Sequence, residues 1–275
     1  MVKKQLIMEK ASELFAKQGF KATSVQQITE HCGISKGALY LSFNSKDELI
    51  SSIIDHYMSQ VTANFDYIVS HSDKEDLLYD FYREYYHFFN KHANIAKIFI
   101  KETQSLNEEL IDRMRYYNQL HEKIILTMID RLYGKKVRDV KYDLLYCIKK
   151  LLNMYAEVFL LNDIYLDFNV LAQSLVEKTN IIAENITIPF ITKQQYELLN
   201  FKKVKDLSKE ELIHLLDETI KEIESGLERE SILLLKENLM ETNLSIAIVK
   251  GLIENIRNYP GCEWIAYLLR KYYEL

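Results

Sequence analysis

Several residues near the N-terminus have side chains and spacings suited to contacts with the backbone and base edges of a nucleic acid. Ser35 and Lys36 begin a short predicted helix, and Gly37 has no side chain, which lets the backbone approach a ligand closely. Tyr40 follows one helical turn after Lys36, so its hydroxyl can donate a hydrogen bond to a phosphate. Lys46 opens the next predicted helix, where free N–H groups favour a second phosphate. These residues predict binding to a polyanion.

The elements around these residues predict a helix-turn-helix. Helical periodicity indicates helices near residues 3–18, 25–32 and 36–43. Thr23 and Ser24 precede the second helix, and Gln26 or Gln27 three residues later completes a capping box. Gly33 then ends that helix after two turns. In such a unit the second helix enters the DNA major groove and the first crosses the backbone, so Thr23, Ser24 and Gln26 are further candidate DNA contacts.

Charge is unevenly distributed along the 275 residues. The net charge is −5, but residues 1–46 hold seven Lys against three Glu, a net +4, which leaves −9 for the rest. A positive N-terminal segment on an acidic chain suits a polyanion-binding role. The first arginine is Arg83, so this segment lacks the bidentate Arg–guanine contact. We therefore expect a modestly A·T-biased DNA site.

The segment from Thr23 to Leu49 resembles the DNA-binding domain of the TetR family of bacterial regulators. The positions that carry the resemblance are Gly19, Phe20, Thr23, Val25, Ile28, Gly33, Ile34, Ser35, Lys36, Gly37, Leu39, Tyr40, Phe43, Lys46 and Leu49. The family usually has small residues where this chain has Thr29 and Cys32, and both are still small enough to pack. The resemblance implies an all-α homodimer whose subunits have a three-helix head, a connecting fourth helix and a larger ligand-binding body.

The rest of the sequence predicts further helices throughout. The chain has only seven Gly and two Pro, and apolar residues keep a helical period. We expect an all-α fold with a helix-turn-helix DNA-binding domain over residues 1–46, a helical ligand-binding and dimerisation domain over 47–188, and a helical C-terminal extension over 189–275 whose role stays open. The resemblance implies that helices near 140–162 and 166–187 form the dimer interface.

Aromatic residues are frequent between residues 57 and 128, where core packing and a ligand cavity both account for them. The rings between Tyr82 and Phe89 cannot all face one core stripe, and buried Tyr hydroxyls need partners, so some line an interface, a cavity or the surface. The candidate ligand contacts are Tyr86, Phe89, Tyr117, His121 and Glu157. An apolar or amphipathic small-molecule effector suits such a cavity, and Tyr faces with acidic residues would also accept a cation.

Catalytic and metal-binding patterns are weak by comparison. Glu84 and His87 have the spacing of carboxylate di-iron bundles, but such a site needs a second pair and two more Glu. The sequence lacks GxSxG, a phosphate-binding glycine loop and HExxH, and its three Cys are widely spaced. We expect no enzymatic activity, cofactor or metal site. Without a long apolar run or a signal peptide, we also expect a cytoplasmic protein with no membrane span.

The combined patterns leave two functional hypotheses. The first is a DNA-binding transcriptional regulator, a ligand-released repressor that binds a palindromic operator as a homodimer. The alternative is a helical protein-interaction adaptor whose extension docks a partner, with no small-molecule inducer. DNA affinity that falls steeply with salt favours the regulator, and a flat dependence favours the adaptor.

Overall fold

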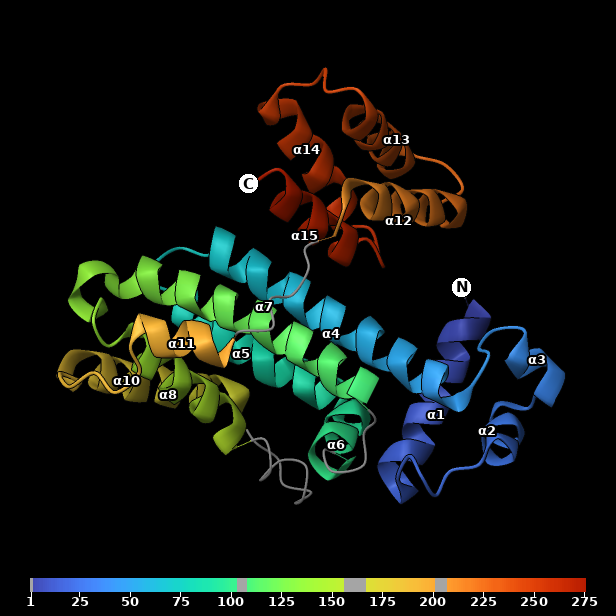
Figure 1. The fold of residues 1–275 in the computed structure, drawn as a ribbon, viewed down its shortest axis with the longest axis horizontal. Helices are drawn as coiled ribbons and strands as arrows, with labels where there is room; N and C mark the ends of the chain where they lie inside the picture. Colours follow the sequence, from blue (N-terminus) through green and yellow to red (C-terminus); the bar gives the residue numbers. More distant parts are fainter. Residues whose placement is uncertain (1, 103–107, 156–166, 201–206) are drawn as a thin grey trace.

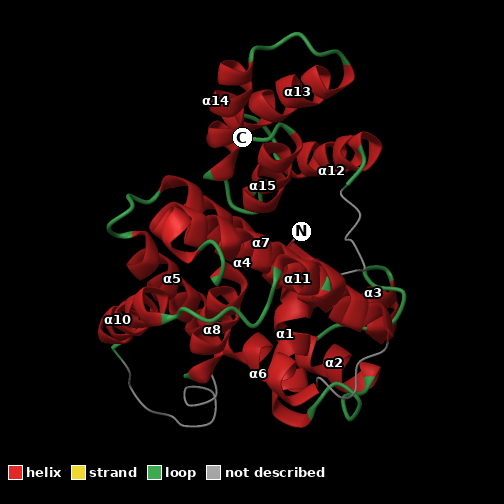
Figure 2. Ribbon diagram, turned by 60° about the vertical axis from the view of Figure 1, so that its left-hand side comes forward, coloured by secondary structure: helices red, strands yellow, loops and turns green. Residues whose placement is uncertain are grey.

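The computed structural model of the protein describes residues 2–102, 108–155, 167–200 and 207–275. Helices joined by short connections make up these ranges, and no β-strand occurs within them (Figure 2). The all-α fold predicted from the helical periodicity is therefore confirmed. No helix in these ranges combines the length and the apolarity that crossing a bilayer requires.

The N-terminal head is a three-helix unit whose buried residues are part of a larger apolar cluster. It consists of α1 (Val2–Gln18), α2 (Val25–Cys32) and α3 (Lys36–Tyr40). Its fully buried residues include Ile7, Phe15, Ile28, Leu39 and Phe43. The predicted capping box is present, because Ser24 accepts from the Gln27 N–H and Gln27 accepts from the Ser24 N–H. Helix α3 ends three residues earlier than predicted, where a turn buries Phe43 and leaves Leu41 exposed.

Helix α4 (Lys46–His71) connects the head to the rest of the molecule (Figure 1). Its 26 residues span about 39 Å at the rise of an α-helix. Ser45 accepts from the Glu48 N–H at its start, as the sequence predicts. The N-terminal half of α4 buries Leu49 and Ile53 in the core of the head, whereas its C-terminal half buries Phe65 in the core of the body.

The body packs around the second half of α4. Its helices are α5 (Leu77–Lys91), α6 (Ala93–Glu102), α7 (Glu108–Tyr133), the short 3₁₀ helix η1 (Gly134–Val137), α8 (Lys141–Met154) and α10 (Phe168–Asn185). A buried hydrogen bond of 2.7 Å between the hydroxyls of Tyr82 and Thr179 joins α5 to α10. The spacing of Ser72 and Glu75 predicts a capping box and a helix start at residue 73. In the structure, Ser72 instead ends α4, and its hydroxyl donates to Asp80 inside α5.

The C-terminal extension divides into two parts. Helix α11 (Lys193–Leu199) lies against α8, where the Tyr196 and Tyr142 rings stack at 4.7 Å and Asp143 accepts from the N–H of Ile191. The other helices are α12 (Lys209–Glu222), α13 (Leu227–Met240), α14 (Ile246–Arg257) and α15 (Glu263–Tyr272). They form a compact cluster that places α15 on α4 (Figures 1 and 2).

A buried arginine fastens the extension to α4. Arg270 on α15 is only 10% exposed at its side chain and lies 3.6 Å from Asp66 on α4 and 3.5 Å from Glu254 on α14. Its Nη2 also donates to the Leu275 carbonyl at 3.4 Å. Burial raises the pKa of Asp66 despite this guanidinium, so both partners lose hydration where the two units meet.

Replacing Arg270 tests this attachment. Arg270→Ala removes the guanidinium that pairs with Asp66 and Glu254, and it should lower the free energy of opening of α15 by about 2–3 kcal/mol. The loss is limited to this size because both carboxylates are partly exposed to water. Hydrogen exchange of the α15 amides measures the change, and Lys250→Ala on the exposed face of α14 is the control. Equal protection of the α15 amides from exchange in both variants would show that Arg270 does not hold α15 on α4.

Candidate DNA-binding surface and ligand cavity

The predicted recognition residues form one exposed surface at the start of α3. Ser35, Lys36, Gly37 and Tyr40 are all solvent-exposed, and Tyr40 keeps 48% of its surface. The Ser35 hydroxyl accepts from the Ala38 N–H at 3.2 Å and so caps α3. A Cβ added at Gly37 would meet only the Ser35 hydroxyl, at 3.9 Å, so packing inside the head does not require glycine there. This surface has the shape and the donors to approach DNA.

Three of the other predicted contacts, Thr23, Ser24 and Gln26, have hydrogen-bond partners within the head. Thr23 is 1% exposed, and its hydroxyl donates to the Gly19 carbonyl at 2.7 Å. Ser24 caps α2, while Gln26 is exposed and donates to Glu30 on its own helix at 2.9 Å. The structure therefore keeps Gln26 on the surface and places the Thr23 hydroxyl inside the turn.

Lys46 lies in a different environment from the one that the sequence predicted. Its ammonium group donates to the carbonyls of Phe20 and Thr23 at 2.8 and 2.9 Å and lies 4.4 Å from the centre of the Phe20 ring. These contacts tie the turn between α1 and α2 to the start of α4. Two of its three donors are thus used inside the head, which leaves one for a phosphate.

An apolar cavity of about 300 Å³ lies between α4, α5, α6, α7 and α8. One wall is an aromatic column in which Tyr85 stacks on Phe89 at 4.5 Å and on Phe65 at 5.8 Å. The Tyr85 hydroxyl donates to Asn153 at 3.2 Å, so this buried ring has a polar partner. A volume of this size within apolar walls is typical of a small-molecule site.

The polar groups at the cavity wall are few, and two of them are paired within the protein. His121 shares a hydrogen bond of 2.8 Å with the Thr62 hydroxyl, and burial lowers its pKa to about 4, so it is neutral at pH 7. Lys149 forms an ion pair with Glu122, which is 2% exposed and also accepts from Asn118. No carboxylate lines the cavity within the described ranges, and its wall gives no support to the expectation of a cationic ligand.

The predicted ligand contacts divide into three groups. Phe89 and His121 line the cavity. Tyr86 is almost fully buried and donates to the Leu152 carbonyl at 2.8 Å, and Tyr117 donates to the Asp55 carboxylate at 3.2 Å, so neither ring belongs to the wall. Glu157 lies outside the described residues.

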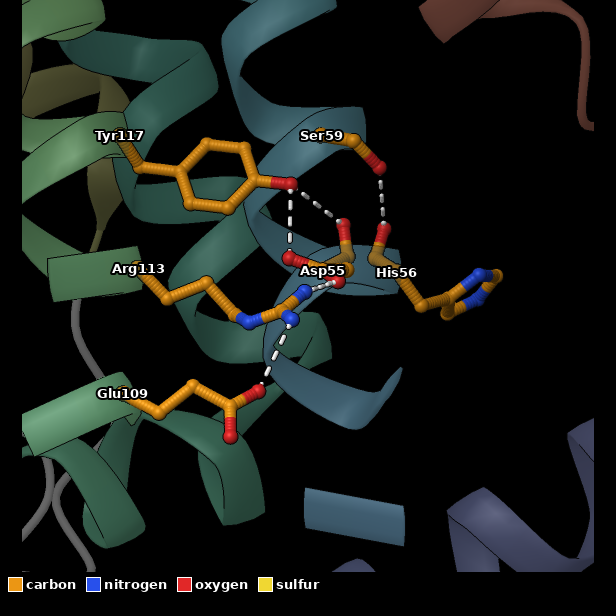
Figure 3. Close-up of polar contacts among 6 residues, drawn as sticks. All are labelled: Asp55, His56, Ser59, Glu109, Arg113 and Tyr117. Carbon is orange, nitrogen blue, oxygen red and sulfur yellow. Dashed lines mark hydrogen bonds and ion pairs between the residues drawn. The ribbon is translucent and has the colours of Figure 1, made fainter. Parts of the chain in front are cut away.

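Tyr117 belongs instead to a polar cluster that holds α7 against α4 (Figure 3). Arg113 pairs with Asp55 on α4 and with Glu109 on its own helix. Burial raises the pKa of Asp55 above its usual value even with the Arg113 guanidinium beside it. These contacts fasten the first turns of α7 to the half of α4 that is nearer the head.

Sequence reasoning missed several residues of the cavity wall. These are Val61, Phe88, Met114, Asn118, Lys149 and Leu152. Each lies on an amphipathic helix, and the sequence pattern of such a helix is the same whether its apolar face meets a filled core or a cavity. The spacing of Phe65, Tyr85 and Phe89 carried the best signal, since large rings at helical intervals pack with gaps more readily than aliphatic residues.

Comparison with known proteins identifies the head. Residues 7–53 match the family of bacterial regulatory proteins described as the tetR family. The HTH-type transcriptional regulator YuxN of Bacillus subtilis (strain 168) is 26% identical over 98% of each chain. The N-terminal domain is a TetR-family DNA-binding domain. The protein is a DNA-binding transcriptional regulator, as the resemblance of its N-terminal segment implied.

Other regulators match this chain over two thirds of its length or more. The HTH-type regulator YerO of Bacillus subtilis (strain 168) is 23% identical over 92% of this chain and 89% of its own. The solved TetR-family regulator PfmR of Thermus thermophilus has a TM-score of 0.56 at 23% identity, covering 66% of this chain and 99% of its own. The fatty acid degradation regulator FadR of Bacillus halodurans has a TM-score of 0.57 at 16% identity and covers 67% of this chain and 96% of its own. About a third of this chain thus lies outside the part that matches each of these two solved structures.

Two lysines of the head should differ in their effect on its stability. Lys46→Ala removes two hydrogen bonds to carbonyls and should lower the free energy of unfolding by about 1–2 kcal/mol. Lys36→Ala removes an exposed side chain and should change it by less than about 0.5 kcal/mol. Urea unfolding followed by circular dichroism measures both, and equal losses would refute the internal role of Lys46.

The buried imidazole of His121 predicts a pH dependence of stability. Its pKa is about 4 in the folded protein against 6.5 ordinarily, so the folded state binds fewer protons between these values. The free energy of unfolding should therefore fall as the pH drops from about 6.5 to 4 and level off above 6.5. The glutamine of the His121→Gln variant does not take up a proton in this range. Between pH 6.5 and 4 this variant should therefore lose ~2 kcal/mol less of its free energy of unfolding than the unchanged protein.

His214→Gln is the control for that experiment, because His214 lies on the exposed surface of α12. Its unfolding profile should follow that of the unchanged protein. A profile of His121→Gln with the same slope between pH 6.5 and 4 would show that His121 is not kept neutral.

Proposed function

We propose that this protein is a ligand-released TetR-family repressor that binds a palindromic operator as a homodimer. In this proposal residues 1–46 contact DNA, residues 47–188 bind the effector and dimerise, and residues 189–275 support the effector site. The protein acts by binding rather than by catalysis, in the cytoplasm where the chromosome lies. The observation that carries the proposal is that α4 lines the cavity with one half and enters the core of the head with the other.

The head supplies the electrostatic part of DNA binding. Lys17, Lys21 and Lys36 are exposed, and Lys36 lies beside the recognition surface. One head offers few phosphate contacts, whereas two heads double the number and contact two half-sites about one helical turn, or a multiple of it, apart. The shortage of base-contacting arginines makes dimerisation more important for affinity.

Exposed apolar residues support dimerisation through the body. Val170 and Ile181 on α10 are more than half exposed, and Ile188 and Phe190 in the segment after it keep 82% and 80% of their surface. Isolated apolar side chains on a surface are ordinary, but several large ones along one helix and its continuation are typical of an interface. A second copy that packs α8 and α10 against its own would cover this surface.

The route from cavity to DNA runs through two helices. Tyr57, Val61 and Phe65 place α4 on the cavity wall, and Ile95 with Ala96 places α6 there. Helix α6 also contacts α1 of the head. A ligand that enlarges the cavity would shift α4 and α6, and with them the distance between the two heads. It can lower DNA affinity only by the difference between its affinities for the two dimer geometries.

The adaptor alternative has one observation in its favour. Leu234 and Met240 on α13 and Ile246 and Ile248 on α14 are 43–53% exposed. Apolar side chains at these positions would suit a protein partner. In this alternative the extension docks the partner and no small molecule acts.

The salt dependence of DNA binding separates the two hypotheses. A duplex selected from random DNA should show twofold symmetry, and the affinity should fall steeply as salt rises. Lys36→Ala should weaken binding about tenfold and reduce the slope of log affinity against log salt by about one. Fluorescence anisotropy at several salt concentrations measures both quantities, with Lys250→Ala as the control.

A flat salt dependence would overturn the repressor proposal and favour the adaptor. The effector step has its own test, because Val61→Phe fills the cavity from α4. Operator binding by this variant should no longer respond to any small molecule that releases the unchanged protein. A normal response would exclude the apolar cavity as the effector site.

A further inference from the structure

A second, polar cavity lies directly beside the apolar one. It has a volume of about 380 Å³ between α4, α5 and the start of α15, and we call it the polar hollow. Phe88 and His92 line both cavities, so a partition of two side chains separates them.

The partition combines an aromatic surface with a polar group. His92 caps the C-terminal end of α5, and its ring lies 4.5 Å from the Phe88 ring and 4.8 Å from the Tyr57 ring. Burial and the nearby Lys91 ammonium lower the pKa of His92 to about 4. The ring is therefore neutral at pH 7 and offers one donor and one acceptor.

The polar hollow differs in character from the apolar cavity. Its wall carries two carboxylates against one ammonium group, together with amide and imidazole groups. These residues are Gln60, Asn64, Glu84, His87, Lys91 and Glu263. Because the carboxylates outnumber the ammonium group, the wall is net negative. The hollow therefore suits a group that donates hydrogen bonds and carries no negative charge.

The extension contributes one of these carboxylates. Glu263 begins α15, and one of its oxygens accepts from the Gly261 N–H at 2.9 Å, which orients the side chain. Arg270 on the same helix is fastened to Asp66 on α4. The Glu263 carboxylate thus has a defined place opposite α5, although it lies nearly 180 residues away from Glu84 in the chain.

We propose that the effector is amphipathic, with an apolar body in the cavity and an amine-bearing head in the polar hollow. On binding, the side chains of Phe88 and His92 turn apart, and the head binds Glu84 of the body and Glu263 of the extension. This proposal rests on the proposed effector site and adds the chemical class of the ligand. It also assigns a role to the extension, which completes the site.

Three probes with the same chain and different heads test the proposal: decylamine, 1-decanol and decanoic acid. Calorimetric titration of the full-length protein, below the concentrations at which the probes aggregate, measures each affinity. Decylamine should bind most tightly and decanoic acid least. Trp264 is the only tryptophan in the sequence, and its ring packs on Tyr117 and Tyr267, so its fluorescence reports movement of α15 against α7 when a probe binds.

Variants of the hollow should change selectivity without abolishing binding. Glu263→Gln and Glu84→Gln should each weaken decylamine about three- to fivefold, the range of a partly exposed ion pair, and change 1-decanol less than about twofold. Glu228→Gln on α13 is the matched control. Val61→Phe, with Met114→Phe as a second filling variant, should block all three probes, because both residues line the apolar cavity.

The outcomes separate this proposal from the one on which it rests. If the filling variants block binding but the two Glu variants leave the amine-to-alcohol ratio unchanged, the polar hollow does not hold the head, and the apolar effector site stands. If the probes bind the filling variants as tightly as the unchanged protein, the apolar cavity is not the site, and both proposals fail. Tighter binding of decanoic acid than of decylamine would overturn only the assignment of an amine-bearing head, and the apolar effector site would stand.

Discussion

The burial of α4 along almost its whole length is the constraint on which the rest of the structure depends. Its first half is packed into the head, its second half into the body, and α15 of the extension covers part of its outer surface. An α-helix of 26 residues resists bending, since each turn carries its own hydrogen bonds. In the proposed mechanism, a displacement at the cavity wall would therefore reach the head as a movement of the whole helix.

The same constraint accounts for the position of Lys46. A long helix can move the head only if its first turn is firmly joined to the head, and the Lys46 ammonium makes this joint by binding two carbonyls of the turn between α1 and α2. A side chain that resembles a phosphate contact in the sequence thus serves mainly to stabilise the head. In the recognition surface, by contrast, the Ser35 hydroxyl caps α3, and the side chains of Lys36 and Tyr40 are exposed to solvent.

The hydroxyls of three buried tyrosines in the body are all hydrogen-bonded. Tyr82, Tyr85 and Tyr86 direct their hydroxyls to Thr179, to Asn153 and to the Leu152 carbonyl, which fixes each ring. Rings held in this way cannot collapse into the space between α4, α5 and α7. The apolar volume therefore persists beside a polar hollow, which the extension borders through Glu263.

The sequence by itself determined the local structure of the protein. The span of α2 and the capping boxes at Ser24, Thr192 and Ser208 follow from contacts within three or four residues, which sequence spacing expresses directly. The helix-turn-helix was recognisable for the same reason. Only the tertiary structure decided which rings line the cavity, where the Lys46 ammonium binds, and that Glu263 faces α5. These contacts join residues far apart in the chain, and an amphipathic face looks the same in the sequence whether it meets a filled core, a cavity or another unit.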